Sequence, residues 1–250
     1  MTYPNLKNKH LEQAIIRADH SGEGKKKYFG KIPNKCIILY QDPPFNYLKK
    51  KFKGKYQKLD VNFSWGFKGI YYTKNFVFCM MSGIGAPHAT LMFEELIALG
   101  INEFINVGIA GGLRKFGVFL CDKAIRDEGT SQHYILHEKY SYPNKLLTEK
   151  LEKVMKKYNV TFERATNWTI DAPLMETKKE VEIYKKEGVA TVEMEISALF
   201  VVAQLRKVKI AAAFVVSDVL NDDWKDMNQE NFVKKDLVKV TECAIDCFSK

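Results

Sequence analysis

The amino-acid sequence predicts an α/β fold, and two observations carry that prediction. Short apolar runs alternate with amphipathic stretches along the chain, as they do where strands and helices alternate around a sheet. Hydrophobic residues make up 46% of the 250 residues, which is enough for a substantial core. The sequence contains no internal repeat, low-complexity segment or linker, so we expect residues 1–250 to form a single domain.

The apolar runs mark the expected strands, and the amphipathic stretches between them mark the expected helices. Strands are expected at residues 36–40, 76–81, 103–107, 120–127, 160–166, 190–194 and 210–217. Helices are expected at residues 87–99, 145–157, 178–187, 196–207 and 228–248. Residues 21–31 are rich in Gly and Lys, and we expect a mobile surface loop there.

Composition argues against several functional classes. No stretch approaches the roughly 20 unbroken apolar residues of a membrane helix, and the N-terminal residues MTYPNLKNKH lack the apolar centre of a signal peptide. Five scattered cysteines without CxxC spacing indicate neither a disulfide framework nor a zinc site. We therefore expect a cytoplasmic protein that has no membrane partner.

The net charge of +9 raises the question of nucleic-acid binding. The run KKKFKGKYQK at residues 49–58 is basic, with aromatic residues interleaved. Lysines also crowd residues 25–31, 145–157 and 178–186, where acidic or apolar residues accompany them. This distribution favours a solvated lysine-rich surface over one continuous phosphate-binding stripe, so we expect no nucleic-acid partner.

Two glycine-rich turns are expected after strands, and ligands of open α/β sheets bind at the carboxyl ends of strands. The first runs from Ser82 to Pro87, contains Gly83, and leads into a helix whose N-terminal N–H groups can face an anion or a ribose hydroxyl. The second runs from Gly108 to Gly112, where glycines let the backbone approach a ligand closely. Tight turns without a ligand explain either segment equally well.

Acidic residues stand in unusual places in the C-terminal half. Glu193 and Glu195 flank Met194 at the end of an apolar strand, and Asp218 ends the apolar run IAAAFVVSD. Charged groups there are costly unless they are paired or used. Such carboxylates can accept hydrogen bonds from sugar hydroxyls, and one in a dry pocket can act as a proton donor. Helix capping by Ser217 or Asp218, and a helix-dipole role for Glu195, are the structural alternatives.

Four segments together carry a resemblance to a known family. They lie in order between about Met80 and Asp218 and read SGIGAPHATLMFEELIALGINEFINVGIAGGL, RDEGTSQHY, DAPLMET and VEMEISALFVVAQLRKVKIAAAFVVSD. The chain resembles the nucleoside phosphorylase and nucleosidase family, which includes purine nucleoside phosphorylases, uridine phosphorylases and methylthioadenosine nucleosidases. The second and third segments are most similar to the uridine-phosphorylase-like branch.

The resemblance implies a three-layer α/β sandwich around a mixed, barrel-like sheet. It also implies a homodimer or hexamer that acts on a ribonucleoside without a metal or other cofactor. In the family the VEME segment binds ribose, so Glu195 is expected to hold the 2′ and 3′ hydroxyls and Met194 to pack on the sugar, beside Glu193. The SD pair lies beside the base, so Ser217 is expected there and Asp218 is expected to protonate a departing purine, or to lie near a pyrimidine.

Other expected contacts of the substrate rest on single residues. Gly83 is expected to bind substrate, and Trp168 or Pro173 to pack against the base, although a tryptophan is more often a core residue. By resemblance to some family members, His10 could contact the active site of a neighbouring subunit. We expect instead that the N-terminal residues around it are frayed. His133 and His137 fall in an expected strand or loop, where residues four apart do not share a face, so we predict no metal site.

The chain departs from the family pattern where phosphate would bind. The family's phosphorylases carry a glycine and an arginine after the first strand, where this chain has Gln41-Asp42-Pro43. A second arginine is replaced by Asn106, which precedes Gly108, and a hydroxyl residue is replaced by Ile109. A third arginine would fall near Asn62 or Phe63. Guanidinium groups suit a doubly charged phosphate, so their loss argues against an ordinary phosphate site.

Three functions therefore remain open for this sequence. The first is phosphorolysis of a ribonucleoside with inorganic phosphate at a rearranged site around Asn106, Gly108 and Ile109, and family weight keeps it first. The second is hydrolysis, since Asn at this position also occurs in the family's nucleosidases. The third is a binding paralogue without turnover. Asp42 is the nearest acid, and a relocated anion site would have to use Lys49, Lys50, Arg114 or Arg126.

Overall fold

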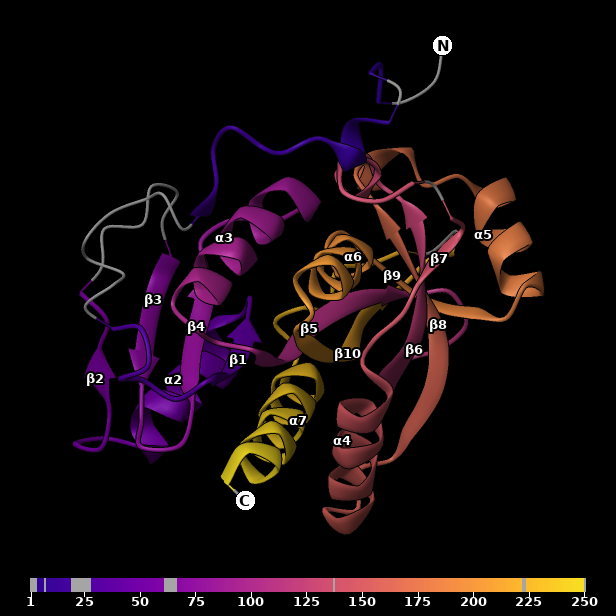
Figure 1. Ribbon diagram of the computed structural model, residues 1–250. Coiled ribbons are helices and arrows are strands. Elements are labelled where there is room, and N and C mark those ends of the chain that lie inside the picture. Colours follow the sequence, from indigo (N-terminus) through magenta and orange to yellow (C-terminus); the bar gives the residue numbers. More distant parts are fainter. Residues whose placement is uncertain are drawn as a thin grey trace.

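The computed structural model describes residues 4–6, 8–18, 28–60, 67–136, 138–221 and 224–249 (Figure 1). The strands are β1 Lys35–Leu39, β2 Gln57–Lys58, β3 Phe67–Tyr72, β4 Val77–Met81, β5 Glu103–Gly112, β6 Val118–Asp127, β7 Tyr140–Ser141, β8 Phe162–Ile170, β9 Val189–Glu193 and β10 Lys209–Val219. The helices are α2 Asp42–Lys51, α3 Ala86–Ala98, α4 Lys145–Lys157, α5 Lys178–Lys186, α6 Ile196–Arg206 and α7 Asn231–Ser249. Short 3-10 turns are η1 Lys9–Leu11, η3 Ser131–His133 and η4 Pro173–Met175.

The strands form a mixed sheet that closes on itself. Its continuous order is β10-β6-β8-β9-β5-β1-β4-β3-β2, and β10 also pairs with β5, so that β5, β10, β6, β8 and β9 complete a ring. Within the ring β5 runs parallel to β10 and antiparallel to β9. The strands β1, β4, β3 and β2 extend the sheet outward from β5. This is the mixed, barrel-like sheet that the resemblance implied.

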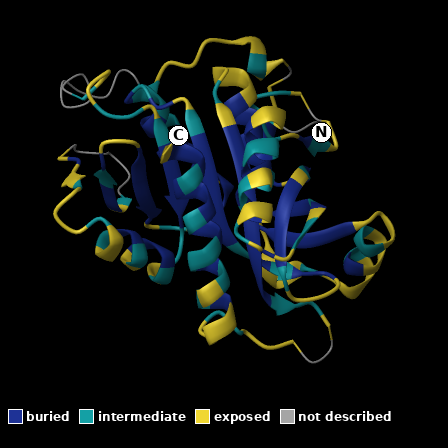
Figure 2. Cartoon of the chain, turned by 90° about the horizontal axis from the view of Figure 1, so that it is seen from below, coloured by how far each residue is buried: buried dark blue, intermediate teal, exposed yellow. Residues whose placement is uncertain are grey.

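Helices cover the sheet on both faces, which gives the molecule three layers (Figure 1). On one face α2, α4 and α7 pack on the sheet through Phe45, Leu48, Leu151 and Leu237, all buried. On the other face α3 and α6 pack through a second cluster that includes Phe93. Figure 2 shows the consequence, with buried strands in the centre and helices exposed on their outer sides. Burial of apolar area on this scale is the main stabilising term in folding.

Helix α6 lies in the core and fixes the position of the VEME segment. Residues 196–203 are all buried and, apart from Ser197, apolar, as expected for a helix enclosed by protein over most of its length. Glu195 is its N-cap residue, so the VEME segment passes directly from β9 into this helix. The acidic residues are therefore held between a barrel strand and a buried helix.

The predicted strands and helices lie within a few residues of their expected ranges except at the end of β5, and several elements of the structure were not predicted. Helix α2 was not predicted, although Pro43 and Pro44 occupy its first turn, where proline is well tolerated. Strand β3, a short strand next to the sheet edge, was also not predicted. Of the loop expected at residues 21–31, residues 21–27 lie outside the described residues, and residues 28–31 form a turn.

The prediction of a turn at Gly108–Gly112 is wrong, because strand β5 continues through these residues. They pair with β10 on one side, and Gly111 and Gly112 pair with β9 on the other. A Cβ atom on Gly112 would lie 2.7 Å from Cγ1 of Val216 and 2.8 Å from the carbonyl oxygen of Lys115. The glycine there permits close approach of three chain segments where the barrel closes, rather than a reversal of the chain.

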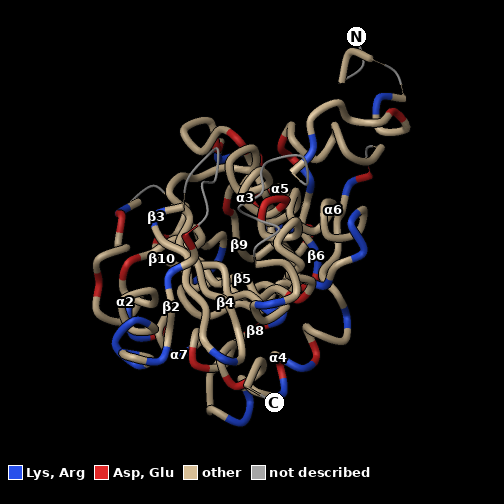
Figure 3. Tube along the Cα trace, turned by 60° about the vertical axis from the view of Figure 1, so that its left-hand side comes forward, with Lys and Arg blue, Asp and Glu red and all other residues tan. Residues whose placement is uncertain are grey.

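Charged residues of both signs are interleaved along the chain (Figure 3). Surface pairs include Lys157 with Asp246 and Lys209 with Glu103. In the basic run, Lys51 at the end of α2 pairs with Glu242 of α7. Each such pair contributes only about 0–1 kcal/mol to stability. Among the helices of the described residues, none combines the length and the apolar character that a membrane crossing requires.

Candidate functional site

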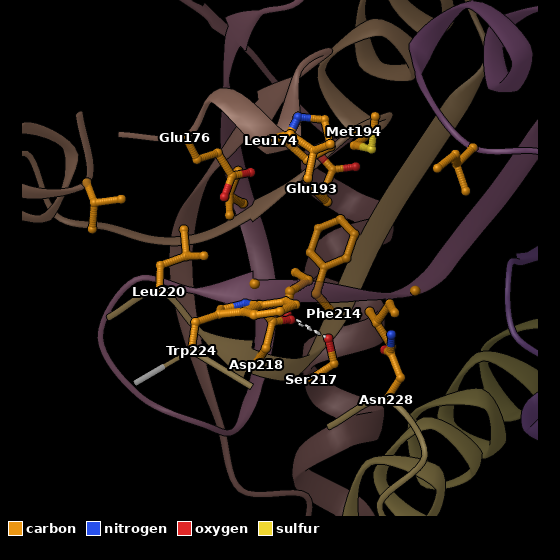
Figure 4. A pocket seen from close by; sticks show the side chains of 18 of the residues that line it. Leu174, Glu176, Glu193, Met194, Phe214, Ser217, Asp218, Leu220, Trp224 and Asn228 are labelled. Carbon is orange, nitrogen blue, oxygen red and sulfur yellow. Dashed lines mark hydrogen bonds between the residues drawn. The ribbon is translucent and has the colours of Figure 1, made fainter. Parts of the chain in front are cut away.

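One cavity of about 910 Å³ opens where several strands end (Figure 4). Its wall includes Tyr40 and Gln41, which follow β1, and residues 108–111 of β5. Residues 192–195 contribute from the end of β9, and residues 217–218 from β10. Helix α5 and the η4 turn form another side. The cavity therefore gathers the two acidic segments and the second glycine segment that the sequence singled out.

Glu193 is buried and receives four hydrogen bonds. The side chains of Asn167 and Thr169 donate to Oε1 at 2.7 and 2.6 Å. The backbone N–H groups of Glu195 and Ile196 donate to Oε2, each at 2.8 Å. Burial raises the pKa of Glu193, and the Glu195 carboxylate raises it further, while the bonds from Thr169 and the backbone act in the opposite direction. Glu193 thus fixes the strand-to-helix junction.

Glu195 joins the acidic segment to the first glycine turn. The N–H of Gly85 donates to Oε1 of Glu195 at 2.6 Å, and Gly85 adopts a φ of 92°, which favours glycine. The Glu195 side chain is buried at the cavity wall, and burial raises its pKa. A buried carboxylate in this position is available to accept hydrogen bonds from neutral hydroxyl groups of a ligand.

The first glycine turn is held by His88 of α3. The N–H of Gly83 donates to Nε2 of His88 at 3.1 Å, and burial lowers the pKa of this histidine. A Cβ atom on Gly83 would lie only 3.1 Å from Cγ of His88. Ile84 lines the cavity, whereas Gly83 lies behind it against the His88 ring. The structure therefore places Gly83 beside the site rather than on its wall.

Ser217 and Asp218 lie on the wall opposite Glu193 and Met194 (Figure 4). A bulge between Val216 and Asp218 shifts the register of β10 against β5 at this point. The Ser217 hydroxyl donates to Oδ1 of Asp218 at 2.8 Å, and Nε1 of Trp224 donates to Oδ2 at 2.7 Å. Trp224 was not identified from the sequence, because nothing near it in the chain indicates a site.

Glu176 is a further acid on the cavity wall that was not singled out as a site residue. It follows η4, within the DAPLMET segment. Its side chain points into the cavity (Figure 4). Burial raises its pKa to about 7, with additional contributions from Asp218 and Glu180. Pro173 and Leu174 of the same turn also line the cavity. The segment thus contributes to the site through residues that its motif did not identify.

At the β1 and β5 end the cavity wall is polar but uncharged. The Tyr40 hydroxyl donates to Oδ1 of Asn106 at 3.0 Å, so Asn106 lies buried behind Tyr40, while Gly108 and Ile109 reach the wall. Oε1 of Gln41 is buried with no hydrogen-bond partner among the described residues. The same holds for Oδ1 of Asn228, which opens on the same cavity. These two amide oxygens are acceptors in need of donors.

The cations considered for a relocated anion site have other partners. Arg126 donates to Ser131 Oγ and to the carbonyl oxygens of Ile135 and Leu136, and Arg114 pairs with Glu163. Lys49 lies over the rings of Phe45 and Tyr71, and neither it nor Lys50 lines the cavity. Asp42 begins α2 and pairs with Lys68. In the described part of the wall the cations are Lys178 and Lys185 of α5, on a different side from Gln41.

Several other sequence-selected residues lie away from the cavity. Trp168 is fully buried, packs against the tilted ring of Tyr184 and donates through Nε1 to Asp127 at 2.9 Å. It is not part of the cavity wall. Asp171 accepts from the N–H of Gly129. His133 forms a hydrogen bond with Lys9, the residue before His10 in η1. His137, Asn62 and Phe63 lie outside the described residues, within which no three His, Cys, Asp or Glu side chains are grouped as metal ligands.

Comparisons with known proteins agree with this architecture. The family model described as Phosphorylase superfamily matches residues 49–249. Over 145 residues the chain is 28% identical to a purine nucleoside phosphorylase from Plasmodium vivax (strain Salvador I), which covers 55% of this chain and 59% of that protein. The match thus spans less than two thirds of that relative.

Solved structures show the same fold. A uridine phosphorylase from Vibrio fischeri ES114, complexed with 6-hydroxy-1-naphthoic acid, gives a TM-score of 0.69 at 23% identity, over 88% of this chain and 91% of that chain. An AMP nucleosidase from Bacteroides thetaiotaomicron VPI-5482 gives a TM-score of 0.70 at 16% identity, over 92% and 99% of the two chains. Because the family model spans most of the sequence, the protein belongs to the phosphorylase superfamily.

Proposed function

We propose that this protein is an enzyme that binds a ribonucleoside and cleaves its N-glycosidic bond. The observation that carries the proposal is the cavity itself, in which Met194 faces Ser217 and Asp218 from the opposite wall, and Glu195 lines the cavity next to Met194 in the chain. A ribose against the first pair brings its base toward the second. Family membership supports an enzyme that acts on a nucleoside.

The residues suit the charge that develops as the bond breaks. Loss of the base leaves a cation-like ribose, which the nearby carboxylates stabilise. Glu195 accepts hydrogen bonds from the 2′ and 3′ hydroxyls, and its bond from Gly85 holds the carboxylate in place. Met194 packs on the sugar face. The base departs with the electron pair of the broken bond and takes up a proton beside Asp218.

Inorganic phosphate is the first candidate for the nucleophile. Transfer of the ribosyl group to phosphate would form ribose 1-phosphate and release the free base. The relative from Plasmodium vivax, which is named as a phosphorylase, supports this reaction. Phosphate would lie near Gly108 and Ile109, which line the cavity beside Asn106. The described residues of the cavity wall include no arginine that could offset the negative charge of phosphate.

Water is the second candidate, and one observation favours it specifically. The unpartnered oxygens of Gln41 and Asn228 require hydrogen-bond donors. Water has two O–H groups to donate, whereas phosphate at neutral pH presents mainly acceptor oxygens. Arg114 and Arg126 are committed elsewhere, which removes two candidate phosphate ligands. Hydrolysis would give free ribose and free base.

A panel assay tests the proposal and separates the two nucleophiles. Adenosine, inosine, guanosine, uridine and methylthioadenosine are incubated with the protein, with and without phosphate, and the products are separated by chromatography. Base release that requires phosphate and yields ribose 1-phosphate establishes phosphorolysis. Equal release in its absence, with free ribose, establishes hydrolysis. Thermal stabilisation by a nucleoside without any release would contradict the enzyme and indicate a binding paralogue.

Assembly and location belong to the same proposal. The family resemblance supports a homodimer or hexamer that works in the cytoplasm without a metal or organic cofactor. Light scattering coupled to size-exclusion chromatography measures the assembly directly. A mass equal to one 28.8 kDa chain at all concentrations would contradict it.

A further inference from the structure

The leaving base must receive a proton, and the cavity contains more than one acid that can supply it. A general acid has to carry its proton on an oxygen atom that is free to approach the base. Family resemblance assigns this role to Asp218. Protein donors bond to both oxygens of Asp218, whereas none among the described residues bonds to the Glu176 carboxyl group. This contrast points to a different division of roles, and the inference rests on the proposed cleavage of the N-glycosidic bond.

Both carboxylate oxygens of Asp218 are occupied. Oδ2 accepts from Nε1 of Trp224 at 2.7 Å, and an indole N–H can only donate, so that oxygen carries no proton. Oδ1 lies 2.8 Å from the Ser217 hydroxyl, which donates to it. Both oxygens of Asp218 are thus turned to protein donors.

The hydrogen bonding of the Glu176 carboxyl group differs from that of Asp218. It is half-buried and points into the cavity from the wall opposite Asp218 and Trp224 (Figure 4). Within the part of the chain that the structure describes, no hydrogen bond or ion pair reaches its carboxyl group. Its oxygens therefore face the space that a ligand would occupy, with no protein donor to hold them ionised.

The charges around Glu176 favour a bound proton. Asp218 of β10 faces it across the cavity, and Glu180 lies one turn along on α5. Glu182, Lys178 and Lys185 of α5 also border the cavity. Burial and the two nearby carboxylates together raise the pKa of Glu176 to about 7, so a large fraction of the group is protonated near neutrality.

We propose that Glu176 is the general acid that protonates the leaving base, and that Asp218 serves as a fixed negative charge. As the C1′–N bond breaks, its electron pair passes to the base nitrogen, the O–H bond of Glu176 breaks, and an N–H bond forms. The nucleophile forms the new C1′–O bond and gives up its own O–H proton, from water or hydrogen phosphate. That proton restores Glu176, so one turnover consumes no further reactant.

The test uses two leaving groups. Glu176→Gln is compared with the parent protein on a nucleoside that the parent cleaves and on 4-nitrophenyl β-D-ribofuranoside, whose nitrophenolate departs without a proton. We expect the kcat for the nucleoside to fall by about 100-fold or more. The kcat for the nitrophenyl riboside should stay within about threefold of the parent value. The parent's nucleoside turnover should fall as pH rises through about 7, and this limb should disappear in the variant.

Controls separate the proton donor from a structural role. Glu187→Gln removes an acid at the end of α5 that pairs with Lys139 and does not line the cavity, and it should leave both rates and the pH profile unchanged. Equal losses on both substrates in Glu176→Gln would overturn the proposal, because a positioning role affects both. An unchanged nucleoside rate and pH profile would overturn it as well. If the parent protein cleaves neither substrate, the proposed function itself fails, which is a distinguishable result.

Discussion

Glu195 is the residue on which ribose binding depends most directly in this account. Its Oε1 is held by the N–H of Gly85, and the side chain is buried between β9 and α6. In Glu195→Gln the side-chain amide oxygen can still accept from the N–H of Gly85. The substitution removes the negative charge that would face the ribose hydroxyls and the developing cation. The substitution therefore tests charge at nearly constant shape.

We expect Glu195→Gln to lower kcat/KM by about 10- to 150-fold, the range for a hydrogen bond to a charged group. Steady-state release of the base measures the effect. Glu187→Gln, at a surface pair with Lys139, is the matched control and should have no effect. A parent-like kcat/KM in Glu195→Gln would remove Glu195 from the site.

Glu176 also makes a prediction for stability. Its folded-state pKa of about 7 lies above the ordinary value of 4.5, so the folded protein binds the proton more tightly than the unfolded chain. Its contribution is fully present below pH 4.5 and is lost as pH rises to about 7. Urea unfolding at pH 5 and pH 8 should therefore show a smaller loss of stability in Glu176→Gln than in the parent. Equal losses would show that Glu176 has an ordinary pKa.

Most strands and helices were predictable because each is a long apolar or amphipathic segment. Helix α4 begins and ends at the predicted residues, Lys145 and Lys157. Helix α2 was missed because its Lys-rich sequence suggested a basic surface run, and only the prolines at its start signal a helix. The glycine segment 108–112 was misread because pairing with two neighbouring strands, rather than local preference, determines its conformation.

The close packing around Gly112 of β5 predicts that one added methyl group lowers the stability of the barrel. Gly112→Ala would place Cβ 2.7 Å from Val216, closer than real Cβ contacts, and we expect a loss of about 1–3 kcal/mol in the free energy of unfolding. Gly108→Ala in the same strand meets its nearest neighbour, Tyr40, at 3.5 Å, an ordinary contact. Urea unfolding of both variants is the measurement. Equal stabilities would contradict the tight packing at Gly112.

The site was predictable as sequence segments but not as a set of side chains. The resemblance assigned one segment to ribose and another to the base, and the structure brings Met194, Glu195 and Asp218 of these segments to one cavity. Trp168 belongs to the core, which no local pattern reveals. Glu176 and Trp224 reach the cavity only through the path of η4 and of the chain after β10, so their position is a tertiary property.

At the scale of the whole molecule, closure of the sheet creates the site. The five strands of the ring place the end of β9 opposite the end of β10, although residues 193 and 218 lie far apart in the sequence. Helix α6 backs one of these segments, and α5 borders the opening. The fold thus supplies a cavity between two acidic segments, which is the arrangement on which the proposed cleavage of a nucleoside rests.

Release of free base from a ribonucleoside tests this account most directly. The purified parent protein and a Glu195→Gln, Asp218→Asn double variant are incubated with the nucleoside panel in phosphate buffer, and free base is measured by chromatography. We predict that the parent releases base from at least one nucleoside and that the folded double variant releases almost none. No release by the parent, or equal release by the two proteins, would contradict the assignment of this cavity as the site of N-glycosidic cleavage.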